Sequence, residues 1–347
     1  MLSFSRSSYL LALLLTAFPI MAQEPPAKAP AAPVAKKQAP AKTAPIEYKP
    51  VVPNSKARSG GSVVAAALRG DNKLESDEDQ QAFDAYVMKW EVAQLVDPKY
   101  YDPKNKKPKT RGAYTSLRAG IKRKLQAGRQ GPAHDRFNQR AIDTIKLIIN
   151  PRSAYRPVVK FNAVLLLSDL DAVEPQMRGR AVITPGVPMP EAVPLLRVIA
   201  TAKAFPDLLK VGALQGLRRH MAAGIRNDAE AARVRAAMNT IVLGAPLEGR
   251  SADVHDWIQS RAAEVLIASG MKGVKMLVAA MRDAQLPLAT RVTVATTLLT
   301  ADLTGIKPAT VKALRGEIQK VLQLARAKVE LPSGKKKPDD EGESQFE

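Results

Sequence analysis

Apolar positions recur along this chain three and four residues apart, in stretches separated by Pro and Gly. This spacing places apolar side chains on one face of a helix, so each stretch predicts an α-helix. Alternation at every second position, which would indicate strands, is absent over any useful length. The predicted helices cover residues 76–97, 113–127, 133–149, 156–170, 191–204, 206–222, 228–243, 252–269, 271–284, 287–301 and 308–329.

From residue 132 onward the predicted helices fall into pairs, and the second helix of each pair carries a common pattern. A cation or polar residue is followed three or four positions later by Ala, and then by Leu or Val. Ala163, Ala213 and Ala263 are 50 residues apart, and Ala295 follows after 32. A helix that cannot bury its own apolar face must stack on its neighbours. We therefore expect these Ala residues to lie where an adjacent helix presses against them.

The repeated pattern resembles the HEAT family of helical repeats and its armadillo relatives, over roughly residues 132–330. Its clearest copy consists of Lys210, Ala213, Leu214 and Leu217. The resemblance implies an all-α fold, an irregular right-handed α-solenoid of HEAT-like helix pairs. Because HEAT arrays mostly bind other proteins along a concave face, it also implies a noncatalytic protein-binding or scaffold module.

The ends of the chain have a different composition. Residues 1–22 combine Arg6 with a short apolar run and a small residue at the end, which predicts a secretory signal peptide; a retained membrane anchor is the alternative. Pro, Ala and Lys dominate 23–60 and predict a disordered, extended linker. A helical segment (61–131), the repeat domain (132–330) and a disordered charged tail (331–347) follow. We expect export to the periplasm, the cell envelope or beyond, with no transmembrane segment after cleavage.

One predicted connection is unusually long. Residues 171–190 contain four prolines, Pro175, Pro185, Pro188 and Pro190, and cannot be helical throughout. Irregular connections of this length are uncommon inside a compact array and are either binding loops or disordered segments. Because the repeats themselves explain packing, this interruption is a better place to look for function.

Charge is concentrated near the N-terminal helices. The net charge is +20, and residues 99–129 hold eleven Lys and Arg against Asp102 alone, just after an acidic stretch at 71–91. Nine of the sixteen aromatic residues lie between 83 and 161. The alternative function is therefore an envelope-associated binder of anionic glycan, lipid headgroup or nucleic acid. A solvated surface and internal acid–base pairing are the competing interpretations. The candidate contacts are Lys104, Lys106, Lys107, Lys109, Arg111, Arg118, Lys122, Arg123 and Lys124.

The sequence contains no recognisable catalytic constellation. Cys is absent, which excludes disulfides, thiol chemistry and Cys-ligated zinc. The three His residues have no partner at metal-ligand spacing, and the neighbouring carboxylates Asp169 and Asp171 are expected to be exposed at a helix end. We expect no cofactor, no metal and no small-molecule substrate. An enzyme of unknown class, with residues converging from distant repeats, is the remaining alternative.

Overall fold

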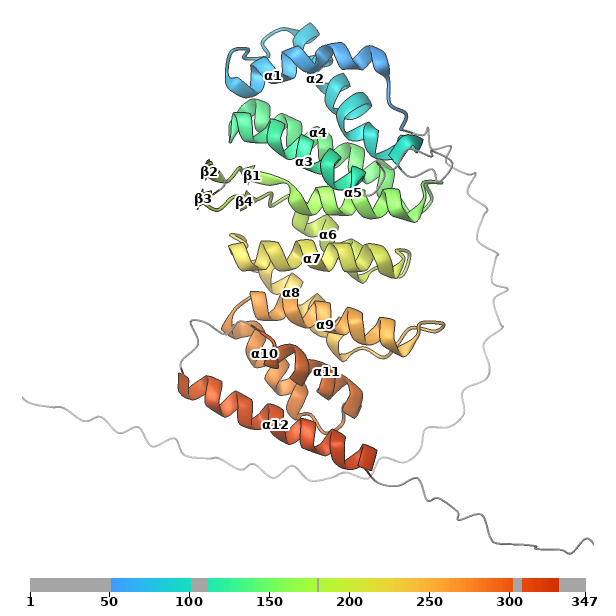
Figure 1. Cartoon of the computed structure of the whole chain (residues 1–347), viewed down its shortest axis with the longest axis vertical. Helices are drawn as coiled ribbons and strands as arrows, with labels where there is room; N and C mark the ends of the chain where they lie inside the picture. The colour runs from blue at the N-terminus through green and yellow to red at the C-terminus, as the bar shows by residue number, and fades with distance from the viewer. Residues whose placement is uncertain (1–50, 101–111, 180, 302–307, 331–347) are drawn as a thin grey trace, which may run out of the picture. The chain divides into compact units, whose positions relative to one another are not determined.

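The structure is a computed structural model that describes residues 51–100, 112–179, 181–301 and 308–330 (Figure 1). Within these residues it consists mainly of helices, with four short strands, so the predicted all-α class is confirmed. The helices are α1 (Gly61–Arg69), α2 (Asp77–Tyr86), α3 (Ala113–Gly128), α4 (Pro132–Ile149), α5 (Pro157–Asp169), α6 (Ala192–Thr201), α7 (Asp207–Ala223), α8 (Asp228–Leu243), α9 (Ala252–Ala268), α10 (Met271–Arg282), α11 (Leu288–Leu299) and α12 (Pro308–Glu330).

Most helix starts and stops follow from local chemistry. Ser76 caps α2, because its side chain accepts a hydrogen bond of 3.1 Å from the Asp79 amide. The helical path continues from α2 through a π turn (Val87–Glu91) and a 3-10 turn (Val92–Val96), and it ends before Pro98, as predicted. Three helical elements were missed. These are α1, a 3-10 turn at Pro98–Tyr100 and a 3-10 helix at Ser55–Gly60, which occupies the last residues assigned to the linker.

Consecutive helices pack in a regular order from α4 onward. Within pairs, α4 packs on α5, α6 on α7, α8 on α9 and α10 on α11. Between pairs, the second helices α5, α7, α9 and α11 pack each on the next, and Figure 1 shows the first three side by side. The recurring residues Ala163, Ala213, Ala263 and Ala295 are completely buried. Their small size therefore matches the close helix contacts that the repeat predicts.

In three of the four repeats, the polar residue that precedes the Ala has a structural role of its own. Lys160 donates from Nζ to the carbonyl of Asn150, the residue that ends α4, at 2.9 Å. Gln259 donates to the Val242 carbonyl at 2.8 Å near the end of α8, and Arg291 to the Met281 carbonyl at 2.9 Å near the end of α10. In these pairs the second helix therefore satisfies carbonyls that the first helix leaves open at its C-terminus.

A single core joins the N-terminal helices to the paired helices. Phe83 of α2 and Phe137 of α4 are both completely buried and meet edge to face, with ring centroids 6.4 Å apart. Ile121 and Leu125 place α3 in the same core. The segments 61–131 and 132–330, which differ in sequence pattern, therefore share one hydrophobic interior.

The Pro-rich interruption is ordered as β-hairpin structure. Strands β1 (Asp171–Val173) and β4 (Val187–Pro188) pair antiparallel at its root, and β2 (Gln176–Arg178) and β3 (Ala181–Thr184) pair antiparallel beyond them. Figure 1 shows this hairpin extending outward between the end of α5 and the start of α6. The expectation that strands were absent was wrong, because the pairing segments are too short for an alternating pattern to be visible.

Close approach of α5, α6 and α7 gives a direct test of the packing. A Cβ at Gly216 would overlap the Ser168 hydroxyl and lie 2.9 Å from Leu196 Cδ1, whereas a Cβ at Gly120 of α3 would meet nothing within 4 Å. We expect Gly216→Ala to lower the free energy of unfolding by about 1–3 kcal/mol through overpacking. Gly120→Ala should raise it by up to about 1 kcal/mol, because Ala favours helix. Urea denaturation followed by circular dichroism measures the free energy of unfolding of both variants. Equal changes in the two would contradict the close contact of Gly216 with Ser168 and Leu196.

Candidate functional site

Buried charges gather at the root of the hairpin. Asp171 and Glu174 are each about 1% exposed. Lys122 of α3 reaches both, with Nζ 2.5 Å from Asp171 Oδ2 and 3.0 Å from Glu174 Oε2. Arg219 of α7 donates to the other Asp171 carboxylate oxygen and, at 2.7 Å, to the carbonyl of Ser168. Two cations, from α3 and α7, and two carboxylates of the hairpin root therefore neutralise each other; together we call these four residues the root cluster.

Neighbouring polar groups hold the root cluster in place. The Asn138 side chain donates to the Asp171 carbonyl at 2.7 Å, and His134 Nε2 lies 3.5 Å from Glu174 Oε1. The Glu174 amide donates to the carbonyl of Arg129 at 2.9 Å. Every charged group of the root cluster already has an opposite charge beside it. The cluster is therefore suited to anchoring the hairpin rather than to binding a substrate.

This geometry corrects the expectation for the two neighbouring carboxylates. Asp171 was expected at an exposed helix end and is instead buried, because the chain turns inward from α5 into β1. Asp169 is partly buried, and its burial raises the pKa of the carboxyl group above the usual value, with Arg118, Arg219 and Lys122 opposing that rise.

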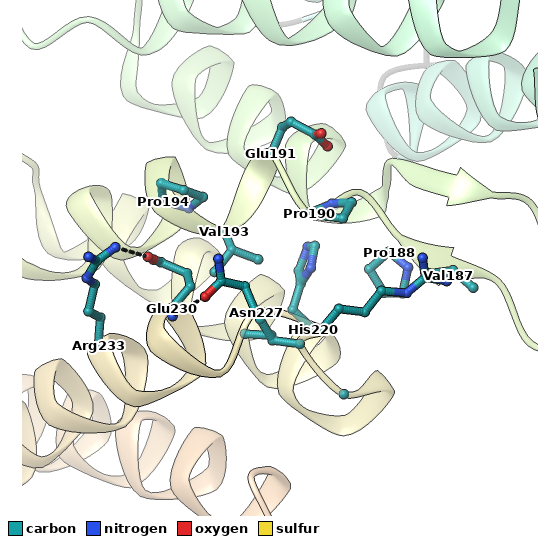
Figure 2. Close-up of a pocket in the computed structure, with 13 residues that line it drawn as sticks. Val187, Pro188, Pro190, Glu191, Val193, Pro194, His220, Asn227, Glu230 and Arg233 are labelled. Atoms are coloured by element: carbon teal, nitrogen blue, oxygen red, sulfur yellow. Dashed lines mark hydrogen bonds and ion pairs between the residues drawn. The ribbon is translucent and has the colours of Figure 1, made fainter. Parts of the chain in front are cut away.

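A pocket of about 420 Å³ opens beside the hairpin root, between β4, the start of α6, the end of α7 and the start of α8 (Figure 2). Most of its wall surface is apolar, and the polar or charged residues Glu191, His220, Arg226, Asn227, Glu230 and Arg233 also line it. Small-molecule and side-chain sites in proteins have this size and character. The apolar lining residues are Val187, Pro188, Pro190, Val193, Pro194 and Ile225.

His220 is the most unusual residue of the pocket. It is 3% exposed, and its Nε2 atom has no hydrogen-bond partner. Burial and the nearby Arg219 together lower the pKa of the imidazole from 6.5 to about 4, and Asp171 partly opposes both. His220 is therefore neutral at pH 7. Figure 2 shows its ring rising from α7 toward Pro190.

Charged residues line the opposite side of the pocket. Glu230 is 8% exposed, and it receives hydrogen bonds from Arg197 at 2.9 Å and from Arg233 at 3.2 Å. Although burial acts to raise the pKa of Glu230, these two guanidinium groups lower it below its usual value. The carboxylate is therefore ionised, and the two guanidinium groups neutralise its charge. The lining contains two further charged residues, Glu191 and Arg226.

The predicted polyanion contacts fall into two groups. Lys104, Lys106, Lys107, Lys109 and Arg111 lie outside the described residues. On α3, Lys122 belongs to the root cluster, and Lys124 Nζ lies 2.5 Å from Glu91 Oε2. Arg118 is partly buried near Asp169, and Arg123 is exposed. Internal acid–base pairing, one of the competing interpretations, therefore applies to Lys122 and Lys124.

The residues that line the pocket were not predicted from the sequence, although the sequence did single out the Pro-rich interruption that contributes some of them. Val187, Pro188 and Pro190 belong to the Pro-rich interruption that the repeat pattern singled out. His220, in contrast, is one of three isolated His residues, and nothing in its neighbours indicates that it lines a pocket. Only the packing of α7 against the hairpin root brings these residues together.

The described residues offer no group of three or more His, Asp and Glu placed to hold a metal ion. None of the helices in the described part of the chain is both long and apolar enough to cross a membrane. A scan against protein-family models, a search of curated proteins and a search of solved structures each find no match to this chain.

Anchoring by the root cluster predicts a large effect of a small change. We expect Asp171→Asn to lower the free energy of unfolding by about 3–5 kcal/mol, because Arg219 then loses its carboxylate partner and Lys122 keeps only Glu174. The matched control is Asp71→Asn, which breaks a pair with Arg69 whose side chains are 57% and 59% exposed and should cost less than about 1 kcal/mol. Urea denaturation measures the free energy of unfolding of both variants. A comparable loss of stability in the two would contradict the anchoring role of the root cluster.

The low pKa of His220 predicts a specific dependence of stability on pH. As pH falls below about 6.5 the unfolded chain takes up this proton first, whereas the folded chain resists until about pH 4. His220→Gln removes the titrating imidazole and with it this contribution to the pH dependence. Between pH 7 and pH 3, the free energy of unfolding of the wild type should therefore fall by about 3 kcal/mol more than that of the variant. NMR titration of the imidazole measures the pKa directly. A value near 6.5 would contradict the assignment.

Proposed function

We propose that this protein is a noncatalytic, exported protein-binding or scaffold module built on helical repeats. The observation that supports this proposal most directly concerns the outer part of the hairpin. Every described residue of β2 and β3 is exposed there. Its apolar side chains include Met177 at 42%, Val182 at 57% and Ile183 at 55% exposure. We name these three residues, with the strands that carry them, the hairpin tip.

The hairpin tip has the properties of a docking element. Met177 and Val182 are cross-strand partners, so their side chains can form one small apolar surface. A two-stranded ribbon also has two open edges, to which an extended segment of another protein can add as a strand. An isolated hairpin is only marginally stable in water, and the root cluster supplies the missing stability by fixing its base on α3, α4 and α7.

The proposed architecture beneath the hairpin is a right-handed solenoid of HEAT-like pairs. It is supported by the sequential packing of α5, α7, α9 and α11, and by the polar residues that cap the preceding helix in three of the pairs. Exposed helix faces beside the hairpin would widen the partner surface. The proposed export rests on residues 1–22, which lie outside the described residues. Residues 23–50 of the linker predicted at 23–60, and the predicted tail at 331–347, also lie outside them.

The alternative function, binding of an anionic polymer, is supported by the exposed Arg123 and by the high positive charge. The structure weakens its support on α3, because Lys122 and Lys124 neutralise the carboxylates Asp171, Glu174 and Glu91. The remaining contacts depend mainly on Lys104 to Arg111. Substituting these residues by neutral ones leaves the sequence of the hairpin unchanged. Such a variant can therefore distinguish binding of an anionic polymer from binding through the hairpin.

The hairpin tip predicts which substitutions remove partner binding. In affinity purification from the protein's own envelope fraction, we expect Val182→Lys with Ile183→Lys to reduce the specific co-purifying proteins at least about tenfold, because interface energy concentrates in a few apolar anchors. Capture by the wild type should persist at high salt, since apolar contacts are not screened.

The matched control places the same substitutions at equally exposed apolar positions elsewhere. Leu299 and Leu324 are 55% and 51% exposed, and converting both to Lys should leave capture unchanged. If capture instead disappears at high salt and on neutralising Lys104, Lys106, Lys107 and Lys109, the anionic-polymer alternative replaces the proposal.

A further inference from the structure

Two consecutive residues of the pocket beside the hairpin root have hydrogen-bond donors that no described residue uses. Arg226 and Asn227 lie in the turn before α8, and both line the pocket. Arg226 is exposed, and its guanidinium group forms no ion pair or hydrogen bond with any residue that the structure describes. A ligand that enters the pocket can therefore use this group without breaking an existing contact.

Asn227 offers the second donor because it caps α8. Its Oδ1 atom accepts a hydrogen bond of 3.0 Å from the Glu230 amide, and Figure 2 shows the Asn227 side chain beside Glu230. The cap occupies the side-chain oxygen, so the Nδ2 group remains as a donor. Within the described part of the chain, nothing accepts a hydrogen bond from it. Arg226 and Asn227 thus both require an acceptor.

The charges around the pocket favour an anion as that acceptor. Three guanidinium groups and two carboxylates lie there, which leaves one positive charge in excess. Two of the cations, Arg197 and Arg233, are already bound to Glu230, and Figure 2 shows Glu191 at the edge of the pocket, apart from the other labelled side chains. The excess charge is therefore that of Arg226. A carboxylate suits it, because its two oxygens match the fork of a guanidinium group.

The rest of the lining requires this carboxylate to carry an apolar body. Pro188, Pro190, Pro194, Val193 and Ile225 form much of the wall. A small hydrated anion gains nothing from such a surface, whereas an apolar group is stabilised by leaving water there. A volume of about 420 Å³ is ample for one large apolar side chain. The lining therefore fits a group with one charged end and an apolar remainder.

The end of a protein chain has this chemistry within a single residue. A C-terminal residue carries both a carboxylate and its own side chain, and capture of C-terminal carboxylates is a known mode of recognition. A second hollow of about 530 Å³ adjoins the pocket, because Pro190 and Glu191 line both. Its other lining residues are mostly polar and suit the peptide groups of a preceding segment; they are Asp135, Arg136, Gln139, Arg140, Ala172 and Met189.

We propose that the pocket receives the apolar C-terminal residue of the partner protein, with its carboxylate bound by Arg226 and Asn227. The residues before it lie over Pro190 in the second hollow. This inference rests on the proposed function, since it names the part of the partner that docks beside the hairpin. Val187 and Pro188 of β4 line the pocket, so the bound chain end contacts the root of the same hairpin whose tip is the proposed docking element.

The test uses the full chain and three acetylated tripeptides. Acetyl-Ala-Ala-Leu has an apolar last residue and a free carboxylate, its C-terminal amide lacks the charge, and acetyl-Ala-Ala-Ala lacks most of the apolar body. We expect the first to bind with a dissociation constant on the order of 1 mM. The other two should each bind about tenfold more weakly, because one loses charge-assisted hydrogen bonds and the other apolar burial. NMR titration of the backbone amides measures all three, with shifts expected at Gly224, Ile225 and Asn227.

Two variants assign the preference for the free carboxylate to Arg226. Arg226→Gln should bind acetyl-Ala-Ala-Leu only as tightly as its amide, and it should fold normally because the replaced side chain is exposed and unpaired. The matched control is Arg235→Gln, since Arg235 is also on α8, forms no ion pair with a described residue and does not line the pocket. This control removes the same charge from the same helix and should keep the preference.

Several results would overturn the proposal: equal binding of the acid and the amide, equal binding of the Leu and Ala peptides, no binding, or a preference that survives Arg226→Gln. The free acid 4-methylpentanoate tests the other source of an apolar carboxylate. It should bind more weakly than acetyl-Ala-Ala-Leu, because it leaves the second hollow empty. Tighter binding of the free acid would show that the pocket takes a small molecule and that the chain-end anchor is wrong.

The hairpin experiment fails or succeeds independently of these titrations, because it measures capture through Val182 and Ile183. If capture by the hairpin persists while the pocket rejects the peptides, the protein-binding role stands and the chain-end anchor is wrong. If the peptides bind but capture does not depend on the hairpin tip, the proposed docking element is wrong and the pocket assignment stands.

Discussion

Close contact between the second helices of successive pairs is the constraint on which the rest of the structure depends. The recurring Ala residues keep α5, α7, α9 and α11 near one another, and Gly216 brings α7 still closer to Ser168 of α5. Interiors are packed as densely as crystals, so such contacts leave no room for larger side chains. Because the second helices are fixed in this way, an insertion between α5 and α6 must leave the stack at its edge, and it emerges there as the hairpin.

The same constraint explains the root cluster. Where α5 ends and β1 begins, carbonyls and carboxylates are buried without the hydrogen bonds of a helix. Lys122 binds the Asp169 carbonyl at 2.7 Å and Arg219 binds the Ser168 carbonyl at 2.7 Å, while both neutralise Asp171. These long side chains come from α3 and α7, on either side of the insertion. The cluster therefore converts an interruption of helical packing into a fixed support for the hairpin.

The sequence predicted the helices well because their apolar spacing is long and repeated, and because Ser76, Pro132 and Pro157 mark helix starts. It missed α1, which is short and begins at the second of two adjacent glycines, and the strands, which span only two to four residues each. The candidate site was predicted only as a region. Its decisive contacts join residues about 50 positions apart, such as Lys122 to Asp171 and Arg219 to Asp171, and no local pattern records them.

The hairpin tip and the pocket differ in what they can contribute to recognition. Exposed Val182 and Ile183 gain apolar burial from any complementary surface, so they add affinity with little selectivity. The pocket can discriminate, because a space of about 420 Å³ with a mostly apolar wall accepts only groups that fit its size and chemistry. Both features depend on the anchored root, because β4 pairs with β1 there and carries Val187 and Pro188 of the pocket. In the proposed function, fit to the pocket therefore adds selectivity to the apolar contacts of the hairpin tip.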